Sequence, residues 1–581
     1  MSFAEWKKRI FGTGSKGATL LLLFFSLFAG LGVTLGRILF MTGEGTGGDM
    51  RKLVLTSLAS GILFFFLTLL GTAVLSRLAR ALYVLAPAEE RTAQPPAWRL
   101  WLILFLSWLP CYIAYYPAIY SYDAEPQLFQ YTGAAFDDHH PLFHTLTLGW
   151  AYDAGQWLQS KGIPLDGMAL YALAQMLVLS FALARLVDLL GALGLTKRGR
   201  TLTMLFFALF PLHPLMAVTT SKDTYFTAFL VLFCVSFTRL LLCEEGAATP
   251  SFCKLLPLAG SALFLMLFRK NGLYMLLVLL FVLLIVVLKR RREKLWRMLF
   301  AATALSVALF LLLHALLMAA LSARRGGAAE ALNIPLQQIA RTYMSSRDAL
   351  TAAGELEEIR VYESEDGLRG YRPYISDVVK QGFDNEAFRR DPAGFLSLWG
   401  KLLFRYPASY AAAVLYHTMG AWYPLDVSHT LVYRDWWRNR TGYYITNATP
   451  VFAERFVKEE NLLPPVRRVY EWFATDCVQL RFVPLQILFS PWLYLTGSFF
   501  LFLLFCIQRR RRALLVSVPH IANLLIVLLG PCIIARYFYP FIALFPLMIC
   551  FASSPYVTET VPLSSRKAPP QAPGVPEASG A

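Results

Sequence analysis

Charged residues are scarce in this sequence. Only 16% of its 581 residues are Asp, Glu, Lys or Arg, whereas an average soluble domain has about 25%. Hydrophobic residues make up 57% of the chain, and the mean hydropathy is +0.51. This composition excludes an ordinary soluble globular protein and predicts an all-α protein that crosses a membrane several times.

Acidic residues are scarcer than basic ones, with 37 Asp and Glu against 54 Lys and Arg, and the formal net charge is +17. The basic residues gather in short runs at the ends of apolar segments, as at 289–292 and 509–512. Lys and Arg in such positions orient membrane spans and contact anionic lipid headgroups. We therefore expect the positive charge to serve contact with the lipid bilayer and not with nucleic acid.

Cysteine is also used sparingly. The eight Cys residues form no CxxC pair, and most lie in or beside apolar runs, so no disulfide framework or cysteine-based metal site is predicted. The sequence contains no internal repeat. The first apolar run, 18–41, is longer than the core of a signal peptide and has no convincing small-residue cleavage site, so we expect a retained membrane anchor.

Long hydrophobic runs, in contrast, are abundant. A helix of about 20 apolar residues crosses the hydrocarbon core of a bilayer, and runs near this length predict about 12 spans. The run at 255–268 is the shortest and could instead be re-entrant. The expected spans are 18–41, 53–79, 99–119, 167–194, 201–219, 224–243, 255–268, 272–288, 297–321, 484–507, 513–530 and 533–553.

The basic runs also predict the sidedness of the chain. If every expected span crosses, the basic runs all fall on one side, which the positive-inside rule assigns to the cytoplasm. Both termini are then expected in the cytoplasm. The predicted parts are two N-terminal spans with a cytoplasmic linker (1–98), a catalytic membrane module (99–321), a mostly helical extracytoplasmic domain (322–482), C-terminal spans (483–553) and a disordered cytoplasmic tail (554–581).

A polar stretch between two apolar runs, within residues 120–145, concentrates the titratable groups. Ionisable side chains are costly if they are drawn into hydrocarbon, so such a concentration in a membrane protein indicates function. We expect this loop to form the mouth of an active site on the outer face. Its groups are Asp123, Glu125, Asp137, Asp138, His139, His140 and His144.

The acidic pair Asp123 and Glu125 predicts either a general base or two ligands of a divalent cation, Mg²⁺ or Mn²⁺. The alternative is an acidic loop that is merely solvated. The following His139 and His140 could contact a phosphate or a sugar hydroxyl, hold the acidic loop in place, or belong to a zinc site. Asp138 could instead cap the helix that follows Pro141.

Further polar groups lie at span ends that we expect on the same outer face. They suit binding of an anionic substrate such as a lipid phosphate, and the alternatives are helix caps and anchors for lipid headgroups. These candidate binding residues are Lys222 and Asp223 at a span start, Arg269, Lys270 and Asn271 in a hairpin, Gln338 and Arg341 after the bundle, and Arg536 and Tyr537 near the last span.

Together these motifs resemble a bacterial multispan membrane family that is similar to the GT-C superfamily of membrane glycosyltransferases, the class that contains the protein O-mannosyltransferases and the lipid A aminoarabinose transferases. The resemblance extends from about Trp98 to Phe551. It implies a GT-C-like helix bundle, a sugar donor linked to polyprenyl phosphate, an inverting reaction, and a glycan, lipid or protein acceptor. It also implies that an acidic residue of the first outer loop acts as base or metal ligand. By position this residue is Asp123, with Glu125 beside it, although Ala124 separates the two acids that are adjacent in the mannosyltransferases.

The main alternative is a transporter or flippase of a lipid-linked or envelope precursor. Such a protein would carry charged groups deep within its spans, along a path through the bilayer. The expected spans contain few: Arg185 and Asp188 lie near one end of a span, and His314 is the one mid-span candidate. A non-enzymatic scaffold for envelope assembly would leave the acidic loop unexplained. We therefore expect a glycosyltransferase.

Overall fold

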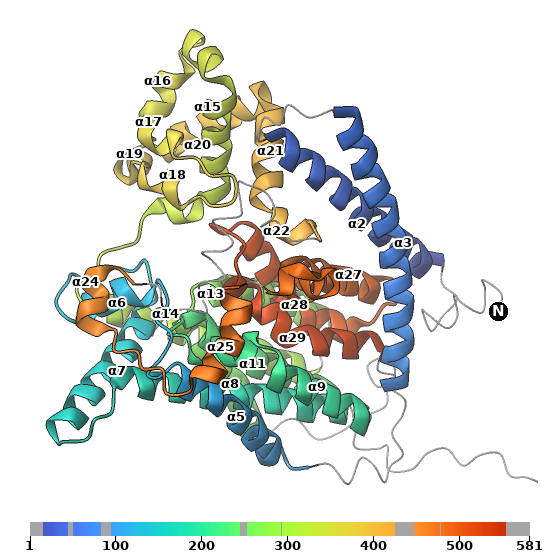
Figure 1. Cartoon of the computed structure of the whole chain (residues 1–581), viewed down its shortest axis with the longest axis vertical. Helices are drawn as coiled ribbons and strands as arrows, with labels where there is room; N and C mark the ends of the chain where they lie inside the picture. Colours follow the sequence, from blue (N-terminus) through green and yellow to red (C-terminus); the bar gives the residue numbers. More distant parts are fainter. Residues whose placement is uncertain are drawn as a thin grey trace, which may run out of the picture.

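The computed structural model of the protein describes residues 16–43, 50–82, 95–243, 252–291, 293–424, 446, 448–476 and 478–553. Within these residues the chain is helical, and its β-bridges are isolated and form no sheet. A membrane bundle lies beneath a smaller helical unit, and a pair of N-terminal helices flanks both (Figure 1). The predicted tail 554–581 and the tryptophans Trp436 and Trp437 lie outside the described residues.

Nine helices of the described part are long and apolar enough to cross a membrane. The prediction of a multispan helical membrane protein is thus confirmed. The nine are α2 (Lys16–Gly43), α3 (Met50–Leu82), α5 (Ala97–Ala114), α8 (Gly167–Ala192), α11 (Lys222–Cys243), α13 (Asn271–Lys289), α14 (Lys294–Ala320), α28 (Arg511–Leu528) and α29 (Ala535–Ser553).

Two runs that we expected to be continuous spans are bent pairs of helices. Helices α9 (Lys197–Leu209) and α10 (Leu212–Val218) meet at 50°, and α26 (Val483–Phe489) and α27 (Pro491–Ile507) meet at 64°. Proline explains both bends, because it lacks the amide that a helix interior needs. Pro211 stands between α9 and α10, and Pro491 is the first residue of α27. If each pair is one span, the candidates number 11.

The short run near 255–268 forms α12 (Phe252–Phe268), which packs against α11. The residue after α12, Arg269, forms an ion pair with Asp223 in the first turn of α11. The two helices are therefore antiparallel, and α12 ends where α11 begins. We call this end of the bundle, marked by the starts of α11, α13 and α29, the site end.

The opposite end of the bundle is marked by backbone contacts and by the basic runs. The amide of Thr196 donates to the Leu82 carbonyl at 2.9 Å, which joins the end of α3 to the start of α9. Arg510 donates to the carbonyl of Phe551, which joins the start of α28 to the end of α29. Three of the basic runs, at 197–200, 289–292 and 509–512, begin or end helices there.

The helical unit above the bundle has a hydrophobic core of its own. This core includes Leu336, Leu368, Phe395 and Leu402, all buried. The predicted helical character of this region is confirmed for the residues described. Its helices are η1 (Ala328–Ala331), α15 (Asn333–Ala352), α16 (Glu355–Arg360), α17 (Glu365–Arg369), α18 (Asp377–Gln381), α19 (Asn385–Arg390), α20 (Pro392–Arg405) and α21 (Pro407–His417).

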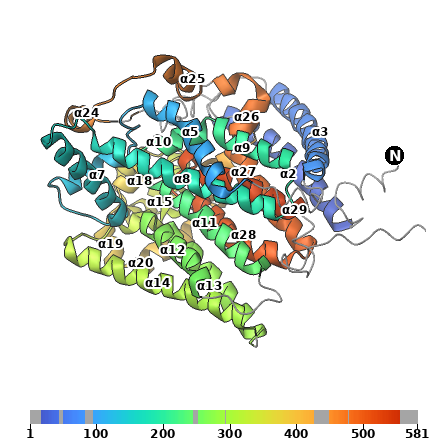
Figure 2. The same ribbon diagram turned by 90° about the horizontal axis from the view of Figure 1, so that it is seen from below.

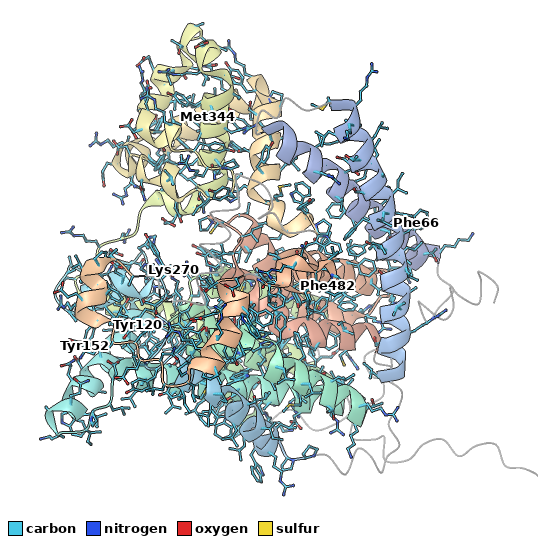
Figure 3. All side chains as sticks on the ribbon, viewed as in Figure 1. Phe66, Tyr120, Tyr152, Lys270, Met344 and Phe482 are labelled. Atoms are coloured by element: carbon cyan, nitrogen blue, oxygen red, sulfur yellow. The ribbon has the colours of Figure 1, made fainter. Side chains whose placement is uncertain are left out.

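The N-terminal helices α2 and α3 form a hairpin at the edge of the bundle, away from α7 (Leu142–Ser160) (Figure 2). Small residues let the two backbones approach closely, as is common between membrane helices. A Cβ atom on Gly30 would lie 2.6 Å from the carbonyl oxygen of Gly61. The far face of α3 is apolar and exposed, with Phe66 on it (Figure 3). Lipid is the solvent that suits such a face.

The remaining short helices connect these parts. Helices α6 (Ala124–Tyr131) and α7 follow the first span of the bundle, and α22 (Met419–Trp422) follows the helical unit. The segment that returns to the bundle contains α24 (Pro450–Phe456), α25 (Pro464–Ala474) and η4 (Val478–Arg481). Helix α24 lies beside α6, although more than 300 residues separate them in the sequence (Figure 1).

Candidate active site

Backbone pairing brings two distant loops together at the site end. The Ile119 amide donates to the Val218 carbonyl at 3.0 Å, and the Thr220 amide donates to the Ile119 carbonyl at 2.8 Å. The Ser121 amide also donates to the Thr220 hydroxyl at 3.0 Å. The loop after α5 therefore lies along the loop before α11. This arrangement places Asp123, at the start of α6, next to Lys222, at the start of α11.

The Asp123 carboxylate is buried between two cations. Its Oδ2 atom contacts both the Lys222 ammonium and the Arg536 guanidinium, and the residue is only 5% exposed. Among the described residues, no side chain or backbone group donates a hydrogen bond to the other oxygen, Oδ1. The two cations thus hold one carboxylate oxygen, while the other accepts no hydrogen bond from the described residues.

A second buried carboxylate, Asp223, extends this arrangement. It forms an ion pair with Arg269, and its Oδ2 atom lies 3.6 Å from the Arg536 guanidinium. Arg269 also stacks over the Tyr537 ring at 4.4 Å, and Arg536 donates to the Tyr537 hydroxyl at 3.1 Å.

We call Asp123, Lys222, Asp223, Arg269 and Arg536 the charged cluster. It holds three cations and two carboxylates in buried surroundings. The cations are thus in excess by one, so the cluster is suited to a further anionic group. Phosphate fits this requirement, because arginine and lysine donate charge-assisted hydrogen bonds to its oxygens.

The charge of the cluster controls the protonation of Asp123. Burial by itself would raise the pKa of this carboxyl, but Arg536 and Lys222 outweigh burial and hold the pKa well below its usual range. Asp123 is therefore ionised at neutral pH. While both cations hold it, its affinity for a proton is low.

His140 is a neutral neighbour of the cluster. Its Nδ1 atom lies 3.1 Å from the Lys222 ammonium, and because an ammonium group can only donate, Nδ1 must accept. Burial first, and then the charge of Lys222, hold the pKa of His140 well below its usual range. The ring proton therefore sits on Nε2, where it can donate to a bound molecule.

Uncharged polar side chains support the backbone of Asp123, and of these only His144 was among the predicted groups. Gln127 donates to the Asp123 carbonyl at 2.8 Å, and its amide oxygen accepts from His144 Nδ1 at 2.5 Å. His144 Nε2 therefore accepts from the Tyr171 hydroxyl at 2.7 Å, which also lies 3.1 Å from the Gln175 amide oxygen. Burial lowers the pKa of His144 to about 3, so this chain of hydrogen bonds is neutral. Gln127 lies inside the polar stretch, which was the one available signal.

Other predicted residues of the loop make separate contacts with the bundle and with the helical unit. Asp138 forms an ion pair with Lys270 at 2.7 Å, and His314 approaches the same carboxylate at 3.7 Å. His139 lies 3.6 Å from Glu330, near the start of the helical unit. Lys270 lies where the bundle meets that unit (Figure 3).

Asp138 does not cap α7. The residue at the N-cap position is Pro141, which has no side chain for capping, and the Asp138 carboxylate is turned toward Lys270 instead. The interpretation of Asp138 as a helix cap was therefore wrong. Asn271, another predicted binding residue, is the first residue of α13.

Glu125 points away from Asp123. Its carboxylate accepts hydrogen bonds from the Thr449 amide at 3.0 Å and the Thr449 hydroxyl at 2.6 Å, at the start of α24. The two acids therefore do not converge on one point. A divalent cation at Asp123 would also face Lys222 and Arg536, so these residues do not fit the predicted Mg²⁺ or Mn²⁺. The part of the chain that the structure describes contains no cluster of three or more His, Cys, Asp or Glu suited to a metal.

Gln338 and Arg341 belong to the interior of the helical unit. Gln338 accepts a hydrogen bond from Trp399 at 2.8 Å, and Arg341 stacks over the Tyr416 ring at 5.0 Å. The structure thus brings together one part of the predicted set, namely Asp123, His140, Lys222, Asp223, Arg269, Arg536 and Tyr537. It places Glu125, Asp138, His139, Lys270, Asn271, Gln338 and Arg341 in other contacts.

Comparison with known proteins gives one match. Residues 128–560, about three quarters of the chain, match the model of a protein family described as "Family of unknown function (DUF6020)". No curated protein and no solved structure matches the chain. The matched range contains the whole charged cluster except Asp123, which lies five residues before it.

Proposed function

Since the chain belongs to the family of unknown function DUF6020, its activity has to be argued from its own residues, and we propose that it is a membrane glycosyltransferase. It transfers a sugar from a polyprenyl-phosphate-linked donor to a cell-envelope acceptor at the outer face of the plasma membrane. The observation that carries this proposal is the buried Asp123 carboxylate, which has one oxygen held by Lys222 and Arg536 and the other without a hydrogen-bond donor among the described residues.

The two oxygens of Asp123 have different tasks in this reaction. Oδ1 accepts the proton of the acceptor hydroxyl as that oxygen attacks the anomeric carbon of the sugar. The new bond joins the acceptor oxygen to this carbon, and the bond from the carbon to the lipid phosphate breaks. Attack from the face opposite the leaving group inverts the anomeric configuration. The departing phosphate gains negative charge, which Lys222, Arg269 and Arg536 stabilise.

The ion pairs also regulate the base. Without donor, Lys222 and Arg536 keep the pKa of Asp123 well below its usual range, so the carboxylate is a weak base. A donor phosphate that shares these two cations reduces their hold on Asp123. Asp123 then binds a proton more strongly when the donor is present, which limits wasteful activation of water.

The surroundings suit a lipid-linked donor. The charged cluster lies at the site end of an apolar bundle, so a prenyl chain can remain in lipid while its phosphate reaches the cations. The basic runs lie at the opposite end, which the positive-inside rule assigns to the cytoplasm. If each bent pair and α12 also cross, they and the nine long helices make 12 crossings, the number expected of the GT-C-like bundle.

The same placement favours surface chemistry over transport. The five charges of the cluster come from the starts of α6, α11 and α29 and from the link between α12 and α13. Asp188 forms ion pairs with Arg185 and Arg239 near the opposite end. The charges therefore gather at two levels and do not line a path across the bundle, as a transporter would need.

The test is a transfer assay on purified protein in lipid. A panel of radiolabelled polyprenyl-phosphate sugars is supplied with a mixture of envelope glycans, lipids and peptides, with and without Mn²⁺. Wild type, Asp123→Asn and the control Asp366→Asn are compared, because the Asp366 side chain is 97% exposed and lies in the helical unit. We expect release of lipid phosphate by wild type and the control, and a loss of at least about a hundredfold in Asp123→Asn.

Because Asp123→Asn leaves two cations with one partner fewer, folding is measured in parallel by thermal unfolding. Full turnover in a folded Asp123→Asn protein would remove Asp123 from the proposed role. Absence of turnover with every donor, together with tight binding of a solute, would favour the transporter instead.

A further inference from the structure

Helix α25 lies on the outside of the bundle, against α5 (Figure 2). It belongs to the segment that leads from α24 to the bent pair α26 and α27, and it contributes no residue to the charged cluster. Its sequence, PPVRRVYEWFA, separates charged from apolar residues with the period of a helix. Arg467, Arg468 and Glu471 share one face, and the apolar residues form the rest of the surface.

One part of the apolar face packs against the ends of neighbouring helices. The Tyr470 ring lies edge-on to the Tyr115 ring, with 6.3 Å between their centroids, and Arg467 stacks over the Tyr115 ring at 4.9 Å. Tyr115 is the residue that directly follows α5. Phe473 stacks on Phe489, the last residue of α26, at 5.7 Å. Helix α25 therefore lies level with the site end of the bundle, where the span α5 ends.

The remaining part of the apolar face is uncovered. Pro465, Val469 and Trp472 follow one another at spacings of four and three residues, so they form one stripe along the helix. Val469 is 44% exposed and Trp472 is 46% exposed. Leu462, just before the helix, is exposed as well. We call Pro465, Val469 and Trp472 the apolar stripe.

Lipid is the partner that fits the apolar stripe. On α5, which α25 contacts, Ile103, Leu106 and Ile113 are exposed, as expected of a span whose face is turned to lipid. The stripe thus belongs to a helix that adjoins a surface covered by the membrane. Tryptophan favours the boundary between headgroups and acyl chains, because its ring is apolar and its N–H group is polar.

The charged face of α25 suits the headgroup region. Arg467 forms ion pairs with Glu459 and Glu471, both at 3.2 Å, and Arg468 pairs with Asp476 at 2.9 Å. Because acids balance these arginines, the face can be hydrated without depending on anionic lipid. A helix with one charged face and one apolar face, placed where a span ends, is typical of helices that lie in the membrane interface.

We propose that α25 is an interfacial helix, which lies in the leaflet at the site end and inserts Val469 and Trp472 between headgroups and acyl chains. This inference goes beyond the proposed function and does not depend on it. The segment before α25 is joined to the loop after α5, because the Glu460 amide donates to the Tyr116 carbonyl at 2.8 Å. Insertion of α25 thus anchors both segments at the membrane surface.

Fluorine NMR on the full-length protein, labelled with fluorotryptophan, tests this placement. The protein is held in nanodiscs of phosphatidylethanolamine and phosphatidylglycerol, and the Trp472 line is identified by its absence from Trp472→Phe, or from Trp472→Tyr if the first variant does not fold. One sample contains a lipid with a nitroxide near the headgroup end of its acyl chain, and another contains a water-soluble gadolinium chelate. The control is Trp399, identified through Trp399→Phe, whose ring N–H donates to Gln338 inside the helical unit.

The lipid nitroxide should broaden the Trp472 line beyond detection and leave the Trp399 line visible. A Trp472 line that survives the lipid nitroxide would overturn the proposal. If the gadolinium chelate then removes that line, water covers the apolar stripe; if it does not, a second copy or another protein covers it. Loss of both tryptophan lines with the lipid nitroxide would also overturn the proposal, because the broadening would not be specific to α25. None of these results depends on turnover in the transfer assay.

Discussion

Replacing Lys222 by methionine tests how the charged cluster controls its base. Methionine keeps much of the length of lysine but removes the charge that contacts Asp123 Oδ2. Two unit charges about 4 Å apart interact by about 4 kcal/mol at the effective dielectric constant of about 20 that describes protein sites. Because Lys222 is one of the two cations that hold the pKa of Asp123 below its usual range, that pKa should rise in Lys222→Met.

The sign of this effect fixes its pH window. The folded-state pKa of Asp123 lies below its unfolded value. Its contribution to stability is therefore present above the unfolded pKa and is lost as the pH falls through the folded pKa. In Lys222→Met the folded-state pKa lies closer to the unfolded value, so this contribution is smaller and its loss is complete at a higher pH. The acid limb of turnover moves to a higher pH for the same reason. Wild type should keep an ionised Asp123 under conditions where the variant is already protonated.

The assay is infrared difference spectroscopy of the carboxylic-acid C=O band during a pH titration. Spectra of Lys222→Met are compared with those of Lys222→Met/Asp123→Asn, so that the difference isolates one carboxyl group. The matched control is Lys270→Met, which removes a cation paired with Asp138 instead and should leave the Asp123 band unmoved. An Asp123 titration that is unchanged in Lys222→Met, or shifted to lower pH, would refute the electrostatic reasoning.

Two further predictions concern stability. Gly61→Ala should destabilise the α2–α3 hairpin by about 1–3 kcal/mol in chemical unfolding, because the new Cβ would lie 2.7 Å from the Gly30 carbonyl oxygen. The control is Gly71→Ala, whose Cβ would have no atom within 4 Å and which should stabilise α3 by up to about 1 kcal/mol. Equal effects of the two substitutions would contradict the close approach of α2 and α3. Burial raises the pKa of Glu363 to about 8, above its unfolded value, so the helical unit should lose about 5 kcal/mol of stability as the pH rises from about 4.5 through 8. Glu363→Gln should abolish this pH dependence of unfolding, monitored by hydrogen exchange, and a dependence that persists in the variant would refute the assignment.

Much of the bundle could be predicted from the sequence, because span length follows from bilayer thickness and needs no knowledge of neighbouring helices. The bends could not be placed in the same way. The runs containing Pro211 and Pro491 are apolar throughout, so hydropathy counts each as one span. Whether proline breaks a membrane helix or is accommodated depends on the groups that satisfy the freed backbone, which are tertiary.

The charged members of the site were visible because charge is rare in this chain. Asp123, Lys222 and Arg536 each stand at the edge of an apolar run, and that position marked them. Their partners could not be inferred, since pairing depends on how the spans assemble. Glu125 shows this limit: it looked like a companion of Asp123, yet it bonds Thr449, 324 residues further along the chain.

The separation of the cluster's parts along the chain has a consequence for its biogenesis. Asp123 and Lys222 are 99 residues apart, and Asp123 and Arg536 are 413 apart. Arg536 begins α29, the last helix of the described chain, so the cluster is incomplete until that helix has been synthesised and inserted. Before then, Asp123 and Lys222 must be kept hydrated or shielded by the insertion machinery. A ribosome stalled before residue 536 would therefore present a bundle without its complete cluster, and insertion of the final helix would be the step that completes the site of the proposed activity.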